Sequence, residues 1–265
     1  MRPCGMARPG VGLSSRRCAA ERRREARLWP AHHEVSSTSL GERSDSDSGS
    51  LSRIINEVND LKISKQIIIV DDYSIDGTRE IILKNENKID KIILHQRNIG
   101  KGAAIKSAQQ YVSGEYVIIQ DADLEYNPKD IYTLLNKIEI EKVKAIYGSR
   151  VLNNEINKKA QNFSHSIRIA GNIFLTKLSN LINNQKLTDA HTCYKLFDSN
   201  LFKSIKLQEN DFSFCPEITT KVSRLNEDIL EVPINYNGRT YNQGKKIKAT
   251  DGLKAIFVLF KYRFF

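Results

Sequence analysis

From Leu51 onward, hydrophobic residues alternate between the spacing of helices and the continuous runs of buried strands. Apolar residues stand at positions 51, 54, 55, 58 and 61, which predicts one face of a helix over 51–61, and Ile67 to Val70 form a β-branched run typical of a strand buried on both faces. The same reasoning predicts helices at 77–84, 101–112 and 128–138 and strands at 91–95, 116–119 and 144–147. Strands that alternate with helices form βαβ units, so we expect an α/β fold with an open, mostly parallel sheet and helices on both faces.

The first fifty residues follow a different pattern. They show no apolar periodicity long enough to bury a face, contain nine Arg and no Lys, and end in the linker-like sequence SDSDSGS. Acidic residues within this segment argue against a mitochondrial transit peptide, and we interpret the basic run Arg22 to Arg24 as solvated. The sequence therefore predicts a disordered Arg/Ser-rich leader over residues 1–50 and a folded domain over 51–265.

Composition places the chain among soluble globular proteins. It is 40% apolar and 27% charged, with a formal net charge of +10. The longest apolar run, residues 256–260, is too short to cross a bilayer. The four cysteines, at 4, 18, 193 and 215, lack the paired spacing of a disulfide framework or a zinc site, which favours a reducing compartment and hence a cytoplasmic location.

Acidic residues follow the predicted strands directly. Asp71 and Asp72 come after the first apolar run, and Asp121 and Asp123 come after the third. Ligands of open parallel sheets bind beyond the carboxyl ends of the strands, so this edge is the expected site. Neither acidic stretch has the residues of a calcium-binding EF-hand loop, and the glycines around Lys101 lack the spacing of a P-loop. Two carboxylates at i and i+2 repel each other unless a cation lies between them, which favours Mg²⁺ or Mn²⁺ bound together with substrate phosphates.

Seven motifs then follow one another in the order seen in family 2 glycosyltransferases. They are VDDYSIDGT (70–78), NIGKGAAIK (98–106), QDADLE (120–125), GSR (148–150), TDAHTCYK (188–195), FCPEI (214–218) and EVPI (231–234), the last followed by a Tyr, Arg239 and GKK (244–246). Residues 51–265 resemble this family, and most of all its polyprenyl-phosphate transferases of the dolichol-phosphate mannose synthase type. The resemblance implies a GT-A fold, a Rossmann-like sheet that binds a nucleotide-sugar and a divalent ion.

The resemblance also assigns a donor site. Asp72 matches the residue that contacts the nucleotide base, and Lys101 lies along the same nucleotide. Asp121 faces the ribose and the sugar and shares the metal with Asp123, while Glu125 stands where some relatives supply a further metal ligand. A metal and cationic side chains stabilise the negative charge of a departing nucleoside diphosphate, so the expected cofactor is Mg²⁺ or Mn²⁺.

The second half of the chain resembles an acceptor site. Arg150, Arg168 and Arg239, with Lys245 and Lys246 nearby, match a basic set that holds the acceptor phosphate. Asp189 and Arg239 are expected to be catalytic. Asp189 would act either as a base for a hydroxyl acceptor or as a residue that orients sugar and acceptor. His191 is interpreted as structural. The expected partners are a nucleotide-sugar and polyprenyl phosphate or a related acceptor, without nucleic acid.

One departure from the family pattern affects activity. Relatives begin with a β-strand that leads into a Pro-x-Tyr-Asn-Glu loop, and residues 1–50 contain no such sequence. We therefore expect the first strand to be missing or replaced, which would expose a sheet edge. The first hypothesis is a metal-dependent, inverting glycosyltransferase that moves a hexose to polyprenyl phosphate or a related acceptor. The alternative is a catalytically impaired remnant or binding module, and a nucleotidyltransferase is a third candidate.

The carboxyl-terminal stretch, residues 253–265, mixes aromatic, aliphatic and basic residues. Two interpretations stay open for it: an interfacial helix that contacts a membrane, and a helix packed on the sheet. The first implies peripheral association with the cytoplasmic face of a membrane.

Overall fold

A computed structural model describes residues 35–41, 48–152, 163–238 and 249–265, and within these ranges it describes the side chains of 49–152, 169–238 and 250–265. Residues His33–Phe265 form one compact unit. Its strands are β1 (Val35–Gly41), β2 (Lys65–Asp71), β3 (Lys91–Leu94), β4 (Tyr116–Asp121), β5 (Ala145–Ser149), β6 (Lys195–Asp198) and β7 (Ile229–Pro233). Its α-helices are α2 (Ser48–Asn59), α3 (Thr78–Lys84), α4 (Lys101–Gln109), α5 (Ile131–Glu141), α6 (Phe163–Asn183), α7 (Ser199–Ser204), α8 (Phe214–Arg224) and α9 (Ala249–Phe264).

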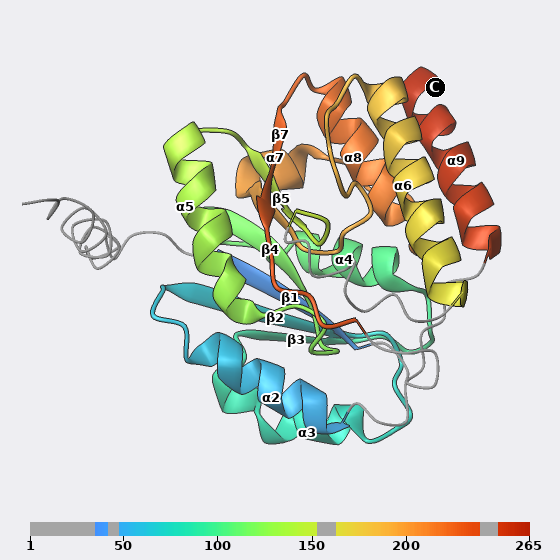
Figure 1. Ribbon diagram of the computed structural model, residues 1–265. Helices are drawn as coiled ribbons and strands as arrows, with labels where there is room; N and C mark the ends of the chain where they lie inside the picture. Colours follow the sequence, from blue (N-terminus) through green and yellow to red (C-terminus); the bar gives the residue numbers. More distant parts are fainter. Residues whose placement is uncertain (1–34, 42–47, 153–162, 239–248) are drawn as a thin grey trace, which may run out of the picture. The chain divides into compact units, whose positions relative to one another are not determined.

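The seven described strands form one mixed, mostly parallel sheet in the order β3-β2-β1-β4-β6-β5-β7 (Figure 1). Strand β6 runs antiparallel to both of its neighbours, and every other pairing is parallel. The expected α/β architecture is confirmed. Each helix and strand predicted between 51 and 147 is present, with ends that shift by a few residues.

The apolar run of β2 is buried on both faces, as its composition predicts. Ile68 and Val70 pack into a core with α4 and α8, whereas Ile67 and Ile69 pack against α2 and α3 on the opposite face. The alternation of side chains along a strand separates the two sets, so a continuous apolar run serves two cores at once.

We expected the first strand of the family pattern to be missing or replaced, with an exposed sheet edge. The structure instead has a strand at this place, so β2 is paired on both sides. Strand β1, with the sequence VSSTSLG, lies between β2 and β4 and pairs in parallel with both. Strand β1 therefore forms backbone hydrogen bonds on both of its sides. These bonds hold it at the centre of the sheet although its sequence contains few apolar residues. The expected leader over residues 1–50 therefore contributes this strand and the start of α2, and its remaining residues lie outside the described ranges.

Helices α6 and α9 lie side by side, and α9 also packs on α8 (Figure 1). Ala255, Val258, Leu259 and Tyr262 form the buried face of α9. The helix is thus packed, although against helices rather than directly on the sheet. Across the described ranges, no helix is long and apolar enough to cross a bilayer.

Candidate active site

The expected donor-site residues meet at the carboxyl ends of β2 and β4, on either side of β1. Asp72 follows β2 and accepts hydrogen bonds from the backbone N–H groups of Ile99 (2.9 Å to Oδ1) and Gly100 (2.6 Å to Oδ2). The ring Nδ1 of His95 lies 2.7 Å from Asp72 Oδ1. Asp72 therefore fixes the loop that enters α4.

Gly100 allows this loop to approach a neighbouring segment. Its φ of +112° lies in the region that favours glycine, and a Cβ at this position would stand 2.5 Å from the carbonyl oxygen of Asn210. The close approach lets Ala103 N–H donate to the same carbonyl at 3.0 Å. The glycine motif thus serves backbone packing at the entry of the helix.

Lys101, the first residue of α4, joins this loop to β4. It is almost fully buried, and its Nζ lies 2.5 Å from Asp121 Oδ1. The structure thus brings Asp72, Lys101 and Asp121 together through the loop 98–100, as the expected nucleotide-binding set requires.

A tight turn holds the other expected metal ligands. Asp123 Oδ1 accepts from the N–H of Glu125 at 3.1 Å, and Leu124 between them adopts a left-handed φ of 58°. Unfavourable backbone conformations of this kind often persist where function requires them. Glu125 is turned toward the other side of the turn, where the hydroxyl of Tyr236 donates to its Oε2 at 2.8 Å.

The carboxylates fit a divalent ion as a pair rather than as a closed cage. In the described part of the chain, no three His, Cys, Asp or Glu side chains form a ready-made metal cluster. Asp121 and Asp123 offer hard oxygen atoms at i and i+2, which suits Mg²⁺ or Mn²⁺ when substrate phosphates complete the coordination. Glu125 would have to leave Tyr236 to join them.

Arg150 and Asp189 form a buried ion pair on the acceptor side. Arg150 follows β5 and donates from Nε to Asp189 Oδ2 at 2.7 Å and from Nη2 to Oδ1 at 2.8 Å. Asn172 of α6 adds a hydrogen bond to Oδ1 at 3.1 Å. Burial alone would raise the pKa of Asp189, but Arg150 and these hydrogen bonds lower it to about 2. Asp189 is therefore ionised at neutral pH and both of its oxygens are engaged, which suits an orienting role better than that of a general base.

Glu231 of β7 fixes the segment that carries Asp189. Its Oε1 accepts from the N–H of Asp189 at 2.9 Å, and its Oε2 accepts from the N–H of Thr188 at 2.6 Å. Glu231 belongs to the EVPI motif, but the position of this motif in the sequence does not predict that Glu231 contacts the segment of Asp189. The strand order β6-β5-β7 brings the two motifs together.

Tyr236 connects the two halves of the site. Its hydroxyl bonds to Glu125 on the metal side, and Arg150 Cζ lies 5.2 Å from the centroid of its ring on the acceptor side. The ring of Tyr126 lies 5.3 Å from that of Tyr236 and stacks on Tyr194 at 5.1 Å. Sequence reasoning placed Tyr236 in a motif but assigned it no role, since its contacts join residues more than 80 positions apart.

The remaining expected acceptor residues fall where the structure gives no side-chain positions. Arg168 lies on α6, one helical turn before Asn172, and its side chain is outside the described residues. Arg239 and Lys245 lie outside the described ranges, as does Lys246. Their roles stay predictions.

His191 is close to this site in sequence but has the properties of a structural residue. Burial, followed by the nearby Lys195, lowers the pKa of its ring to about 4, so the ring is neutral at physiological pH. The interpretation of His191 as structural agrees with this environment.

Comparison with curated proteins gives relatives of modest identity. Over 182 residues the chain is 27% identical to the low-salt glycan biosynthesis hexosyltransferase Agl6 of Haloferax volcanii, a match that covers 69% of this chain and 42% of that protein. Over 220 residues it is 28% identical to the dolichyl-phosphate beta-glucosyltransferase ALG5A of Trichomonas vaginalis, covering 79% of this chain and 64% of that one. The chain thus spans less than two thirds of the length of either relative.

Solved structures share the fold. Glucosyl-3-phosphoglycerate synthase from Mycobacterium tuberculosis, in complex with Mn²⁺, UDP and phosphoglyceric acid, superposes with a TM-score of 0.66 at 14% identity, over 97% of this chain and 84% of that one. Mannosyl-3-phosphoglycerate synthase from Rubrobacter xylanophilus gives a TM-score of 0.62 at 18% identity, over 92% and 75%. At such identities the likeness concerns the fold, which is GT-A. Residues 48–206, more than half of the chain, match the family model described as glycosyl transferase family 2. Together with the motif order and the architecture of the sheet, this match establishes that the chain belongs to glycosyl transferase family 2.

Proposed function

We propose that the protein transfers a hexose from a nucleotide-diphosphate sugar to polyprenyl phosphate or a related phosphate acceptor, with inversion and with Mg²⁺ or Mn²⁺. The observation that carries this proposal is the link through Tyr236, whose side chain contacts both Glu125 of the acidic turn and Arg150. A donor diphosphate held at the acidic turn and an acceptor phosphate held near Arg150 would then lie within reach of each other.

The chemistry needs no covalent enzyme intermediate. An oxygen of the acceptor phosphate attacks the anomeric carbon of the sugar while the bond from that carbon to the diphosphate oxygen breaks. The nucleoside diphosphate leaves with the electron pair, and a single displacement inverts the anomeric centre. A divalent ion at Asp121 and Asp123 would neutralise the charge of the leaving diphosphate.

The protein's own residues position the reactants. A phosphate acceptor is already ionised at neutral pH and needs orientation rather than a base, which agrees with the engaged, ionised state of Asp189. Asp189 holds the guanidinium of Arg150 in one orientation. We propose that Arg168, Arg239 and Lys245 add to this cationic surface.

The relatives support the substrate classes. One is a dolichyl-phosphate beta-glucosyltransferase by name, and one structural neighbour was solved with UDP-glucose and Mn²⁺. The alternative of an impaired remnant or binding module rested on a first strand that is missing or replaced and on the absent Pro-x-Tyr-Asn-Glu loop. The presence of β1 supports the enzyme over this alternative.

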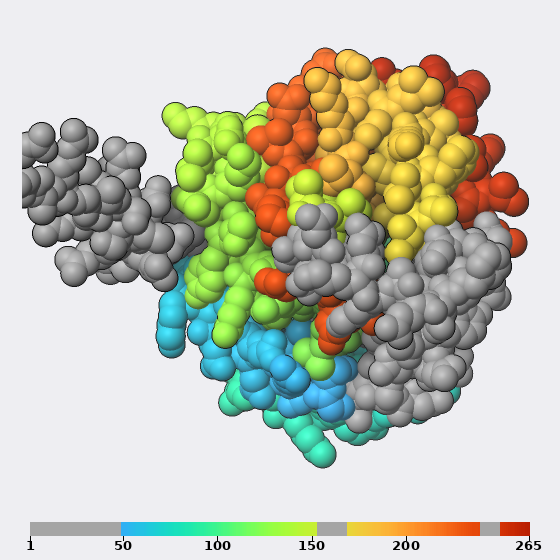
Figure 2. Space-filling model, viewed as in Figure 1, coloured from blue at the N-terminus to red at the C-terminus, as the bar shows by residue number. Residues whose placement is uncertain are grey.

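Peripheral membrane contact is a further part of the proposal. Helices α6 and α9 lie side by side at the surface (Figure 2), and each exposes large apolar side chains on its outward face. Phe174 and Leu181 are exposed on α6, and Leu253, Phe257 and Phe264 are exposed on α9. A face of this kind suits a helix pair that lies on a membrane, where the lipid acceptor would be found. The cytoplasmic location stays a prediction.

The test is metal-dependent donor binding. Asp123→Asn keeps the size of the side chain and removes its charge, so it should abolish Mn²⁺-dependent binding of a nucleotide-sugar while leaving thermal unfolding unchanged. Asp228→Asn, at an exposed position on another loop, is the matched control and should behave as wild type. Titration calorimetry with UDP-glucose, with Mn²⁺ or with EDTA, measures binding, and transfer to polyprenyl phosphate measures turnover. Normal turnover by Asp123→Asn at ordinary metal concentrations would refute the metal assignment.

A further inference from the structure

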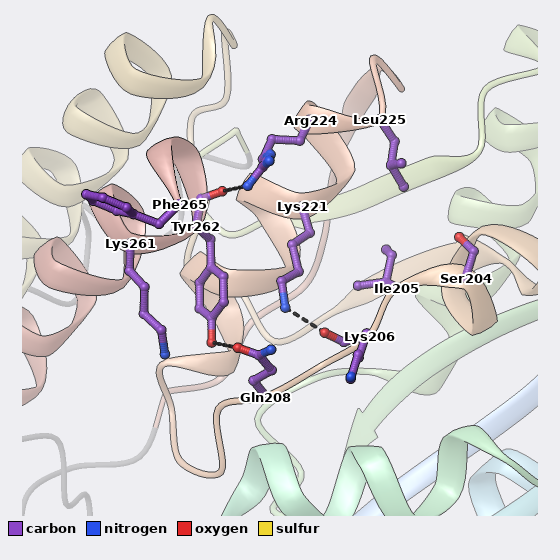
Figure 3. Close-up of a pocket in the computed structure, with 10 residues that line it drawn as sticks. All are labelled: Ser204, Ile205, Lys206, Gln208, Lys221, Arg224, Leu225, Lys261, Tyr262 and Phe265. Atoms are coloured by element: carbon purple, nitrogen blue, oxygen red, sulfur yellow. Dashed lines mark hydrogen bonds between the residues drawn. The ribbon is translucent and has the colours of Figure 1, made fainter.

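A cation-lined cavity lies away from the active site, between the loop after α7, helix α8 and the end of α9 (Figure 3). Its volume is about 500 Å³, large enough for a small organic ligand. Four cationic side chains line it together with two aromatic ones: Lys206, Lys221, Arg224, Lys261, Tyr262 and Phe265. None of the described side chains that line it is a carboxylate.

Two of the four cationic side chains already form ion pairs with carboxylates. Lys221 pairs with Glu217 at 2.5 Å, and Lys261 pairs with Glu209 at 2.8 Å. Among the described side chains, no carboxylate lies within ion-pair distance of Lys206 or Arg224. The cavity therefore keeps a net positive charge, which favours an anion.

The cavity wall is held in place before any ligand arrives. The ring of Tyr262 lies between two ammonium groups, 4.1 Å from Lys221 Nζ and 4.7 Å from Lys261 Nζ. Its hydroxyl lies 2.7 Å from Glu209 Oε1 and 3.0 Å from Gln208 Oε1, and Arg224 Nη1 donates to its backbone carbonyl at 2.8 Å. The bond from Arg224, drawn in Figure 3, places Arg224 at the cavity without further rearrangement.

Helix geometry places this cavity beside the exposed apolar face of α9. Lys261 lies one turn after Phe257 and three residues before Phe264, so it borders the apolar face, and it also lines the cavity. A helix that rests on a membrane buries its apolar face at the headgroup boundary, which brings its flanks to the level of the lipid phosphates. Lys261 belongs to both the flank and the cavity lining, and exposed Phe265 also lines the cavity.

We propose that this cavity binds the phosphate of an anionic lipid headgroup, as an anion site separate from the acceptor site at Arg150. The inference rests on the proposed membrane contact of α6 and α9. Lys206 and Arg224 supply the charge that is not already neutralised, and the aromatic side chains of α9 supply the apolar contact. Such a site would prefer anionic over zwitterionic membranes.

Vesicle flotation with the full chain tests this assignment. The probes are vesicles of phosphatidylcholine with and without phosphatidylglycerol. Combined Lys206→Gln and Arg224→Gln should reduce affinity for the anionic vesicles roughly thirtyfold, since each cation near a lipid surface contributes about 1 kcal/mol. A control with the same loss of charge, Lys84→Gln with Lys129→Gln, removes two exposed cations of other elements and should weaken binding far less.

Other outcomes would overturn the proposal. An equal loss in the control pair would show that net charge alone causes the preference. Loss of the anionic preference on adding sn-glycerol 3-phosphate at low concentration would identify a soluble phosphate as the ligand. A dimer in light scattering that Phe257→Ser disrupts, without vesicle binding, would show that a second copy covers this face.

Donor binding and vesicle binding by the same variants distinguish this inference from the proposed function. Binding of UDP-glucose with Mn²⁺ should be unchanged in the Lys206/Arg224 variant, because the cavity lies on a different set of elements from the acidic turn. Vesicle preference without donor binding would refute the glycosyltransferase proposal and leave the lipid site standing. Donor binding without vesicle preference would refute the lipid site and leave the glycosyltransferase proposal standing.

Discussion

Replacement of Asp189 by Asn tests the central ion pair of the site. The carboxylate is fully buried and accepts three hydrogen bonds from Arg150, at 2.7, 2.8 and 3.2 Å, and one from Asn172. The amide keeps the shape of the side chain but presents an NH₂ group where one oxygen accepted a bond. Arg150 would then be a buried cation without its counter-ion.

Two independent arguments give the magnitude. Removing one partner of a buried ion pair typically costs about 3–5 kcal/mol, because the other charge is left uncompensated. The native environment of Asp189 lowers its pKa from 3.8 to about 2, against the opposing effect of burial, which corresponds to about 2 kcal/mol. We therefore expect Asp189→Asn to reduce the free energy of unfolding by roughly 2–5 kcal/mol near neutral pH.

The pH dependence has a definite sign. Because the pKa of Asp189 is lower in the folded protein, its stabilising contribution is present above the unfolded pKa and is lost as pH falls toward about 2. Between about pH 5 and about pH 8, the difference between variant and wild type should be constant.

Urea unfolding, followed by circular dichroism across this range, measures the difference. Asp228→Asn, at an exposed position, controls for the loss of a carboxylate and should cost less than about 0.5 kcal/mol. A cost for Asp189→Asn as small as that would refute the ion-pair argument. A difference that changed steadily between about pH 5 and about pH 7 would show that Asp189 titrates there, as a general base would.

Two further predictions concern β1 and Tyr236. Deletion of residues 1–32 should leave the cooperative unfolding of the remaining unit intact. Deletion of residues 1–41 also removes the central strand and should abolish cooperative unfolding. Equal behaviour of the two truncations in thermal unfolding would contradict the placement of β1. Tyr236→Phe keeps the ring beside Arg150 but removes the hydroxyl that donates to Glu125. It should tighten Mn²⁺ binding by up to about tenfold if Glu125 is a metal ligand, and unchanged binding in a manganese titration would count against that role.

The sequence by itself determined most of the sheet and the edge where the chemistry lies. The run from Ile67 to Val70 is apolar enough to be buried on both faces, and acidic residues directly after strands must lie at the carboxyl edge of a parallel sheet. Asp72, Asp121 and Asp123 therefore fell at the expected edge.

Strand β1 was decided only by the tertiary structure. VSSTSLG contains two aliphatic residues and no alternation strong enough to predict a buried strand. Its position depends on the backbone hydrogen bonds that β2 and β4 offer on its two sides, and these partners come from later parts of the chain.

The contacts that connect the site were likewise decided by the fold. Asn172, Glu231 and Tyr236 contact Asp189, Arg150 or Glu125 across separations of 17 to 111 residues. Motif spacing fixes which residue types are available, but a side chain's partner depends on which strands are neighbours and how helices cross them. The order β6-β5-β7 brings these residues together, and local sequence carries no direct signal of that order because strand neighbours are chosen by packing over the whole domain.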